Sequence, residues 1–521
     1  MLIAPTLGDL LRAAAEEAPH AEAFRYRDER LTYAEWDQLA DHLAAKLGQH
    51  GVHQGDVVAL LLPSTPLYHL AYAAGARLGA VTTGVNARYR RAEIGHILRR
   101  SGAALLLAVE SWHDADFRGV VDRLRPELPE LRHVLWLSAD AIRTGTRQAL
   151  GLLGASGRAP TIAVAPDDPL AIVFTSGTTG MPRGACYTHR NLMALLEIEA
   201  RRYPEGMPTG QRGISAGLSF AHVGTMTRLP LQIANLGSLL IHDTFDPAAV
   251  LAAIERDRLV HLGGIPTQLI LLLDHPDRRQ RDLTSLRSVL IGGAPATPAL
   301  IRRIQDELHV QVSVRYSSTE VGIATASVVG DPPEILATTV GKPTPGVDLR
   351  IVDAKNQPLA ATAVGEVVIR SPATMRCYWR EPEATAAKVD AEGWIHTGDL
   401  GFLDGSGYLH LRGRQSEMFI RGGYNVYPSE VEDVLARHPG VARAAVVGVP
   451  DAVFGEIGWA FVVPRDASEP ATLAELRQFV GQELASFKRP DGLTLVPDLP
   501  VNAMFKVDKR TLAAQHAEEA K

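Results

Sequence analysis

Short apolar runs alternate with helical patterns along most of the chain. The run "VVALLL" at 57–62 is continuous enough for a strand that is buried on both faces, and a helical pattern with a Thr32–Glu35 capping pair precedes it. A second apolar run, "ALLLAV" at 104–109, follows a helical stretch at 93–102. Because strands that alternate with helices form parallel sheets covered by those helices, we expect an α/β fold with a large N-terminal domain of parallel sheets.

The pattern changes twice toward the C-terminus. Between 337 and 413 the apolar runs are short and turn residues separate them, which indicates a small β-rich subdomain. After the stretch "GRQSE" at 413–417, helical patterns again alternate with apolar runs, and Ser429 with Glu432 forms the expected cap of the first helix. We therefore expect a small α+β domain at this end of the chain.

Composition and charge narrow the class of protein. With 521 residues the chain is too long for one hydrophobic core, and 46% hydrophobic and 21% charged residues are typical of a globular protein. A formal net charge of −6 gives no general attraction for nucleic acid or an anionic membrane, so a polyanionic ligand must be held by local groups. No apolar run has the ~18 residues of a membrane span. We expect a cytoplasmic protein without a nucleic-acid partner, and the oligomeric state stays open.

Cysteine usage points to a reducing compartment. The two cysteines, Cys186 and Cys377, lie far apart in the sequence and lack the spacing of a metal site. This usage argues against a disulfide scaffold and against a zinc site.

A loop rich in glycine and hydroxyl groups follows the apolar run "LAIVF" at 170–174. Seven of the ten residues of "TSGTTGMPRG" at 175–184 are Gly, Ser or Thr. Glycines let backbone amides turn inward and hydroxyls add donors, so such a loop can wrap a phosphate. The Gly-Lys pair of a Walker loop is absent at the required spacing, and a polar surface loop is the alternative interpretation.

Seven strings rich in glycine, hydroxyl-bearing or charged residues are distributed along the chain. They are "TSGTTGMPRG" (175–184), "GGIPT" (263–267), "IGGAP" (291–295), "YSSTE" (316–320), "WIHTGDL" (394–400), "LRGRQSEMFIRGGYNVYPSEVE" (411–432) and "LPVNAMFKVDK" (499–509). Taken together, they resemble the acyl-CoA synthetase family of adenylate-forming, AMP-binding enzymes: they occur in the family's order, and the resemblance covers nearly the full length of the chain.

The resemblance implies a reaction that starts with ATP. The enzyme joins a carboxylate to the α-phosphate and expels pyrophosphate, with Thr319 at a phosphate and Glu320 holding Mg²⁺. Asp399 binds the ribose hydroxyls, assisted by Arg414. The other implied nucleotide contacts are Thr175, Ser176, Gly177, Thr178, Thr179, Gly180, Arg183, Gly292, Gly293, Ala294, Pro295, Tyr316, Ser317 and Ser318.

The resemblance also implies a second step on a mobile C-terminal domain. Lys506 reaches the acyl carboxylate and the α-phosphate during adenylation, and Gly422 and Gly423 then leave room for the pantetheine arm of CoA. Ser416 stands at the hinge, where relatives carry Asp or Lys, and Phe505 replaces the usual Gly before Lys506. The expected domains are 1–413, a hinge at 414–417, and 418–521.

The acid and the acceptor are less closely defined. His222, in "SFAHVGTM" at 219–226, either borders the acid or has a structural role, and both interpretations stay open. The absence of an aspartate from that run favours an apolar aliphatic or aromatic carboxylic acid over an amino acid. Two alternatives remain: an adenylating ligase with another acceptor, through carrier-protein loading or nitrite activation for diazotisation of an aromatic amine, and a non-catalytic nucleotide-binding protein. Lys506 and Glu320 argue against the last, because binding alone needs neither.

Overall fold

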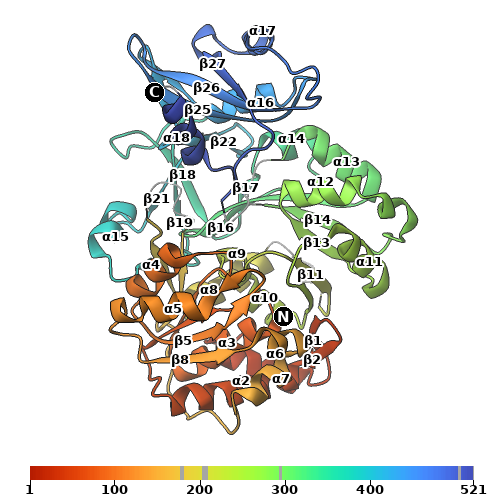
Figure 1. Cartoon of the computed structure of the whole chain (residues 1–521), viewed down its shortest axis with the longest axis vertical. Coiled ribbons are helices and arrows are strands. Elements are labelled where there is room, and N and C mark those ends of the chain that lie inside the picture. The colour runs from red at the N-terminus through yellow and green to blue at the C-terminus, as the bar shows by residue number, and fades with distance from the viewer. Residues whose placement is uncertain (176–180, 202–208, 293–295, 503–505, 520–521) are drawn as a thin grey trace. The chain divides into compact units, whose positions relative to one another are not determined.

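The computed structural model describes residues 1–175, 181–201, 209–292, 296–502 and 506–519 (Figure 1). The described chain forms two compact units. The first comprises Met1–Thr175, Met181–Asp348 and Ile369–Ile395, and the second comprises Leu349–Val368 and the described part of His396–Lys521. The expected domain boundaries at 413 and 418, and the hinge between them, remain a prediction.

The first unit contains a seven-stranded sheet with the strand order β20-β10-β9-β4-β3-β5-β8. The five strands from β9 to β8 are parallel, as expected, and β10 and β20 extend the sheet antiparallel at one edge. Strand β10 is antiparallel because only nine residues separate Phe174, the end of β9, from Gly184, the start of β10, and a crossover to a parallel strand needs about a dozen or more. The strands are β3 (Val57–Leu61), β4 (Val81–Gly84), β5 (Ala103–Val109), β8 (His133–Leu137), β9 (Pro169–Phe174), β10 (Gly184–Thr188) and β20 (Cys377–Tyr378).

A nine-stranded sheet in the same unit has the order β17-β16-β15-β14-β13-β11-β12-β1-β2. Its middle strands are parallel, and antiparallel pairs lie at both edges. Apolar side chains of β11, β13, β14 and β15 pack against α11, α12 and α13 in one buried core. The strands are β1 (Glu22–Tyr26), β2 (Glu29–Thr32), β11 (Arg212–Ala216), β12 (Ser238–His242), β13 (His261–Gly264), β14 (Ser288–Ile291), β15 (Gln311–Ser318), β16 (Gly322–Ala326) and β17 (Lys342–Pro343).

Local capping signals in the sequence account for several helix starts. Thr32 and Glu35 form the expected capping box of α2, in which each side chain accepts a hydrogen bond from the other residue's backbone N–H. The helices of this unit are α1 (Leu7–Glu17), α2 (Tyr33–Gln49), α3 (Pro66–Leu78), α4 (Arg91–Ser101), α5 (Phe117–Leu124), α6 (Ala139–Thr144), α7 (Thr146–Leu152), α8 (His189–Ala200), α9 (Val223–Met226), α10 (Arg228–Ala234), α11 (Pro247–Asp257), α12 (Pro266–Asp274), α13 (Pro298–Leu308), α14 (Pro333–Thr338) and α15 (Pro382–Lys388).

The second unit joins the expected β-rich and α+β parts. Its β-rich part is the sheet β18-β19-β21-β22, and its α+β part is the sheet β24-β23-β26-β25, with β27 beside β26. The strands are β18 (Asp348–Val352), β19 (Gly365–Arg370), β21 (Ile395–Leu403), β22 (Leu409–Arg414), β23 (Phe419–Arg421), β24 (Tyr424–Val426), β25 (Val441–Asp451), β26 (Gly455–Pro464) and β27 (Gly492–Leu495); the helices are α16 (Pro428–Leu435), α17 (Leu473–Glu483) and α18 (Lys509–Glu519).

The expected cap of α16 is wrong. The helix begins at Pro428, so Tyr427 occupies the N-cap position, and no side chain caps the helix there. Proline starts the helix because its fixed φ suits the first helical position. The Ser429 hydroxyl instead donates a hydrogen bond of 2.6 Å to the carbonyl of Arg412.

No helix among the described residues is both long enough and apolar enough to cross a lipid bilayer.

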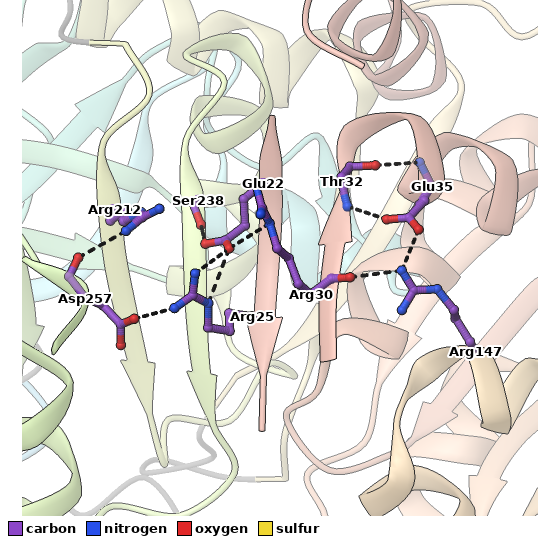
Figure 2. Close-up of polar contacts among 9 residues, drawn as sticks. All are labelled: Glu22, Arg25, Arg30, Thr32, Glu35, Arg147, Arg212, Ser238 and Asp257. Carbon is purple, nitrogen blue, oxygen red and sulfur yellow. Dashed lines mark hydrogen bonds and ion pairs between the residues drawn. The ribbon is translucent and has the colours of Figure 1, made fainter. Parts of the chain in front are cut away.

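Paired charges surround β1, which lies next to the edge strand β2 of the nine-stranded sheet (Figure 2). The buried Glu22 accepts hydrogen bonds from Arg25 at 2.7 Å and from Ser238 at 2.8 Å, and Arg25 also pairs with the buried Asp257. Burial raises the pKa of Glu22, but the hydrogen bonds from Arg25 and Ser238 outweigh it, so the pKa is lowered overall. A buried carboxylate needs such partners to offset its desolvation.

We expect Glu22→Gln to lower the free energy of unfolding at pH 7 by about 1–3 kcal/mol, because it leaves Arg25 with one carboxylate fewer. A lowered folded pKa gives stability that is present above the unfolded value, about 4.3, and is lost as the pH falls through the folded value. The difference between the proteins should therefore shrink below about pH 4. Urea unfolding at several pH values measures this difference in the free energy of unfolding. Asp114→Asn is the control, because the side chain of Asp114 is 84% exposed. Equal stability of Glu22→Gln and the wild type at pH 7 would contradict the assignment.

Candidate active site

The hairpin formed by β9 and β10 closes the glycine-rich loop at its base. The N–H of Thr175 donates to the carbonyl of Arg183 at 2.9 Å, and the N–H of Arg183 donates to the Thr175 hydroxyl at 3.1 Å. Ser176, Gly177, Thr178, Thr179 and Gly180 lie outside the described residues. The two ends of the loop are thus fixed to each other by the sheet.

Arg183 occupies a defined position at the end of this loop. Its guanidinium lies over the ring of Tyr378, with 5.6 Å to the centroid, and its Nε is 3.7 Å from a carboxylate oxygen of Glu381. The side chain is still 52% exposed. Such a cation can bind phosphate while a ring contact and an ion pair limit its motion.

The string Tyr316 to Glu320 lies at the end of β15, and hydrogen bonds anchor its carboxylate. The two oxygens of Glu320 accept from the hydroxyls of Ser318 at 3.1 Å and Tyr378 at 2.8 Å. The Tyr187 hydroxyl donates to the carbonyl of Thr319 at 2.7 Å. Burial, and then the charge of Glu320, raise the pKa of Tyr378, so its hydroxyl remains a donor.

This carboxylate fits a magnesium ion. Each carboxylate oxygen has a second lone pair, so both hydrogen bonds leave acceptor capacity on Glu320. Magnesium is commonly held by one or two carboxylates together with substrate phosphates, rather than by a cage of side chains. The described part of the chain contains no group of three or more His, Cys, Asp or Glu side chains that could hold a metal. A single anchored carboxylate therefore matches the way Mg²⁺ binds beside a triphosphate.

The segment expected at the adenine follows β14. The N–H of Gly292 donates to the carbonyl of Gly264 at 3.3 Å, which connects the end of β14 to the end of β13. Tyr316 is buried and Ser317 is exposed. Gly293, Ala294 and Pro295 lie outside the described residues.

His222 has a structural role in the described chain. Its Nδ1 accepts a hydrogen bond of 3.3 Å from the N–H of Gly224, which caps the short helix α9. This contact supports one of the two interpretations of His222 without testing the other.

Arg228, which the sequence analysis overlooked, begins the next helix, α10. Its guanidinium nitrogens lie 3.2 Å from the position that a Cβ would occupy at Gly263, so glycine makes room for it. The side chain is exposed, yet desolvation by the surrounding protein, followed by the like charge of Arg315, lowers its pKa to about 10. Arg315 is itself paired with Glu199, with both nitrogen to oxygen distances 3.1 Å. In the sequence, Arg228 could have been noticed as a single charged residue within an otherwise apolar stretch.

In the second unit, Asp399 and Arg414 lie opposite each other on β21 and β22. The Arg414 Nε is 3.2 Å from an oxygen of Asp399, which is 7% exposed. The N–H of Asp399 donates to the Thr397 hydroxyl at 3.0 Å, and that hydroxyl donates to the carbonyl of Val367 at 2.6 Å. Arg414 on β22 therefore orients the carboxylate, and Thr397 on β21 fixes the backbone of Asp399.

Gly422 and Gly423 form a tight turn between β23 and β24. Both have positive φ, 56° and 87°, as the two central residues of a type I′ hairpin turn require. The two glycines therefore have a structural role in this turn, and their role at CoA stays a prediction.

Two hydrogen bonds connect Lys506 to Asn502. Its N–H donates to the side chain of Asn502 at 3.1 Å, and its carbonyl accepts from the N–H of Asn502 at 2.8 Å. Phe505 lies outside the described residues. Downstream, the Lys509 Nζ pairs with Glu417 at 3.0 Å and with Glu432 at 2.8 Å. Lys509 therefore connects α18 to the segment after Arg414, where Ser416 is exposed.

Comparison with known proteins identifies the family. The model for the AMP-binding enzyme family matches residues 11–379, and the model for the AMP-binding enzyme C-terminal domain matches residues 430–506. The 3-((3aS,4S,7aS)-7a-methyl-1,5-dioxo-octahydro-1H-inden-4-yl)propanoyl:CoA ligase of Mycobacterium tuberculosis is 38% identical and covers 97% of this chain and 98% of its own. A feruloyl-CoA synthase of Amycolatopsis sp is 35% identical and covers 95% and 96%.

Solved structures agree with this assignment. The crystal structure of ATP-bound MatB from Rhodopseudomonas palustris is 28% identical, covers 99% of this chain and 100% of its own, and superimposes with a TM-score of 0.88. The expected fold class and the expected AMP-forming, ATP-using ligase are confirmed at this level. The chain belongs to the AMP-binding enzyme family.

Proposed function

We propose that this ligase adenylates a carboxylic acid and transfers the acyl group to CoA. The acid carboxylate attacks the α-phosphate of ATP and pyrophosphate leaves; the CoA thiol then attacks the acyl carbon and AMP leaves. The single observation that carries the proposal is the anchored Glu320, with Arg183 stacked on the same tyrosine that anchors it. A carboxylate for Mg²⁺ and a cation for phosphate are the groups that adenylation requires.

Each remaining group has a role that its chemistry suits. Thr319 and the loop from Thr175 bind the phosphates, and the Asp399 carboxylate accepts hydrogen bonds from the ribose hydroxyls. Arg414, paired with Asp399 at 3.2 Å, fixes the orientation of that carboxylate. Lys506 neutralises the charge that develops between the acid and the α-phosphate. Ser416 serves as the hinge, and Gly422 and Gly423 leave room for the pantetheine arm.

We prefer CoA to a carrier protein, or to nitrite activation, because the two named relatives at 38% and 35% identity are CoA-dependent. A cytoplasmic location fits the two free cysteines.

The acid is proposed to be a ring-bearing acid with an oxygen atom on the ring. The ligase named above acts on a propanoyl group attached to a dioxo bicycle. The charge of Glu199 favours the protonated form of Arg228, and that carboxylate is itself paired with Arg315. A guanidinium has five N–H donors, so Arg228 can donate to a further acceptor. It follows His222 closely and lies against Gly263, both in strings that the resemblance places near the acid. A carbonyl or hydroxyl oxygen on the ring would accept from Arg228.

The two steps of the proposed reaction can be separated with Lys506→Ala. We expect acyl-CoA formation from acid and ATP to fall by roughly 10²–10³-fold, the cost of losing one preorganised charge-stabilising group. Thioester formation from supplied acyl-adenylate should be unchanged, because that step does not need Lys506. Product masses and AMP release measure both steps, with Lys355→Ala, an exposed lysine of the same unit, as the control. Equal loss of the two steps would refute the role of Lys506, and no acyl-CoA from any acid would refute the function.

Substrate choice tests Arg228. We expect Arg228→Met to lower kcat/KM by roughly 10–100-fold for an acid with a ring oxygen, because a hydrogen bond from a charged donor is lost. The value for the matching acid without that oxygen should change little. Arg302→Met, which replaces a 52% exposed arginine, is the control. If both acids lose activity equally, Arg228 does not recognise the ring oxygen.

A further inference from the structure

The two cysteines of the chain, distant in sequence, face each other in the seven-stranded sheet. Cys186 lies on β10 and Cys377 on β20, and the two are direct partners in the antiparallel pairing of these strands. The 521-residue sequence contains no other cysteine. Both thiols are free in the described structure.

This register brings the two residues within reach of a disulfide. Directly opposed residues of an antiparallel pair have Cα atoms about 4.5–5.5 Å apart, and disulfides span Cα separations of about 4.4–6.8 Å. Opposed side chains also project from the same face of the sheet. A bond between the two sulfur atoms therefore requires little movement of either strand.

The two thiols differ in exposure and acidity. Cys186 is 1% exposed, whereas Cys377 is partly exposed. The hydrogen bond from Cys186 lowers the pKa of Cys377 to about 7, against the effect of burial, and the neighbouring Arg376 contributes in the same direction. The same interaction, together with burial, raises the pKa of Cys186. Because the thiolate is the reactive form, Cys377 is the attacking group and Cys186 the resolving one.

We propose that Cys186 and Cys377 form a reversible modification site, which a peroxide converts to an intrachain disulfide. The Cys377 thiolate attacks one oxygen of hydrogen peroxide, the O–O bond breaks, and a sulfenic acid and hydroxide result. The Cys186 sulfur then attacks the Cys377 sulfur, the S–O bond breaks, and the second oxygen leaves as water. Two thiols lose two electrons, and one peroxide becomes two waters; a dithiol reductant reverses the change.

The location couples this site to the loop and to Glu320. Tyr378, which donates to Glu320 at 2.8 Å, directly follows Cys377. The N–H of Trp379 donates to the carbonyl of Gly184 at 2.7 Å, at the end of the glycine-rich loop. Disulfide formation brings the sulfurs to about 2.05 Å, and Tyr378 directly follows the linked Cys377, so even a small adjustment of β20 reaches its side chain. The effect on catalysis rests on the proposed function: a shift of Tyr378 moves the carboxylate that holds Mg²⁺.

The chemical test uses hydrogen peroxide on the full-length wild type, on Cys186→Ser and on Cys377→Ser. Peptide mapping without reductant should find peptides containing residues 186 and 377 linked, with the loss of two hydrogens, and dithiothreitol should restore the free thiols. Cys186→Ser should accumulate a sulfenic acid at Cys377 that dimedone traps, and Cys377→Ser should stay unmodified at Cys186. Failure of the wild type to form this link, or a link only between two chains, would overturn the proposal.

The catalytic test measures acid-dependent pyrophosphate release before and after peroxide. We expect a loss of roughly tenfold in the wild type, since small displacements of catalytic groups have effects of this order, with recovery on reduction. The Cys377→Ser enzyme, which lacks the thiolate that attacks the peroxide, should keep its rate after peroxide treatment. A linked enzyme with unchanged rate would overturn the coupling to catalysis. Absence of pyrophosphate release before oxidation would instead count against the proposed function, and the peptide map would be unaffected by that outcome.

Discussion

Strand β10 pairs with β9 on one side and with β20 on the other. The positions of the glycine-rich loop, Arg183 and Glu320 in the first unit all depend on this double pairing. The β9 side fixes the two ends of the glycine-rich loop to each other through Thr175 and Arg183. The β20 side brings Tyr378 to both Arg183 and Glu320. The cation proposed to bind phosphate and the carboxylate proposed to hold a divalent cation are thus oriented by one aromatic side chain, whose position is set by backbone hydrogen bonds.

The second unit supplies groups of a different kind. Asp399 and Arg414 fix each other across β21 and β22, and such a pair suits the recognition of a neutral diol without excess charge. Lys506 is hydrogen-bonded to Asn502, and Lys509 connects the helix after it to Glu417 and Glu432. The lysine proposed for adenylation is therefore held on this unit by contacts between described residues. In the proposed cycle, this arrangement lets one charge be delivered for the first step and withdrawn for the second.

Local patterns in the sequence predicted many of the helices and strands. They could not predict contacts between segments that are distant in the sequence. The alternation of apolar runs with helices gave β3, α4 and β5, and the Thr32–Glu35 pair gave the start of α2, because each depends on neighbouring residues. Ser429 failed as a cap because Pro428 begins the helix first. The motif strings identified Glu320 and Asp399, but the Tyr378 contact and the Cys186–Cys377 pairing depend on an edge strand added from far along the chain. Arg228, at the start of α10, was missed because its significance comes from Gly263 on β13, which lies far along the chain.

The anchoring of Glu320 can be measured most directly by ATP–pyrophosphate exchange without CoA, which isolates adenylation. The wild type should show exchange that requires a carboxylic acid and Mg²⁺. Tyr378→Phe, which removes only the hydroxyl that donates to Glu320, should lower the exchange rate about tenfold at limiting Mg²⁺, the loss expected for one hydrogen bond to a charged group. Exchange that is independent of any acid, or a Tyr378→Phe enzyme with the same rate and the same Mg²⁺ requirement as the wild type, would contradict the account.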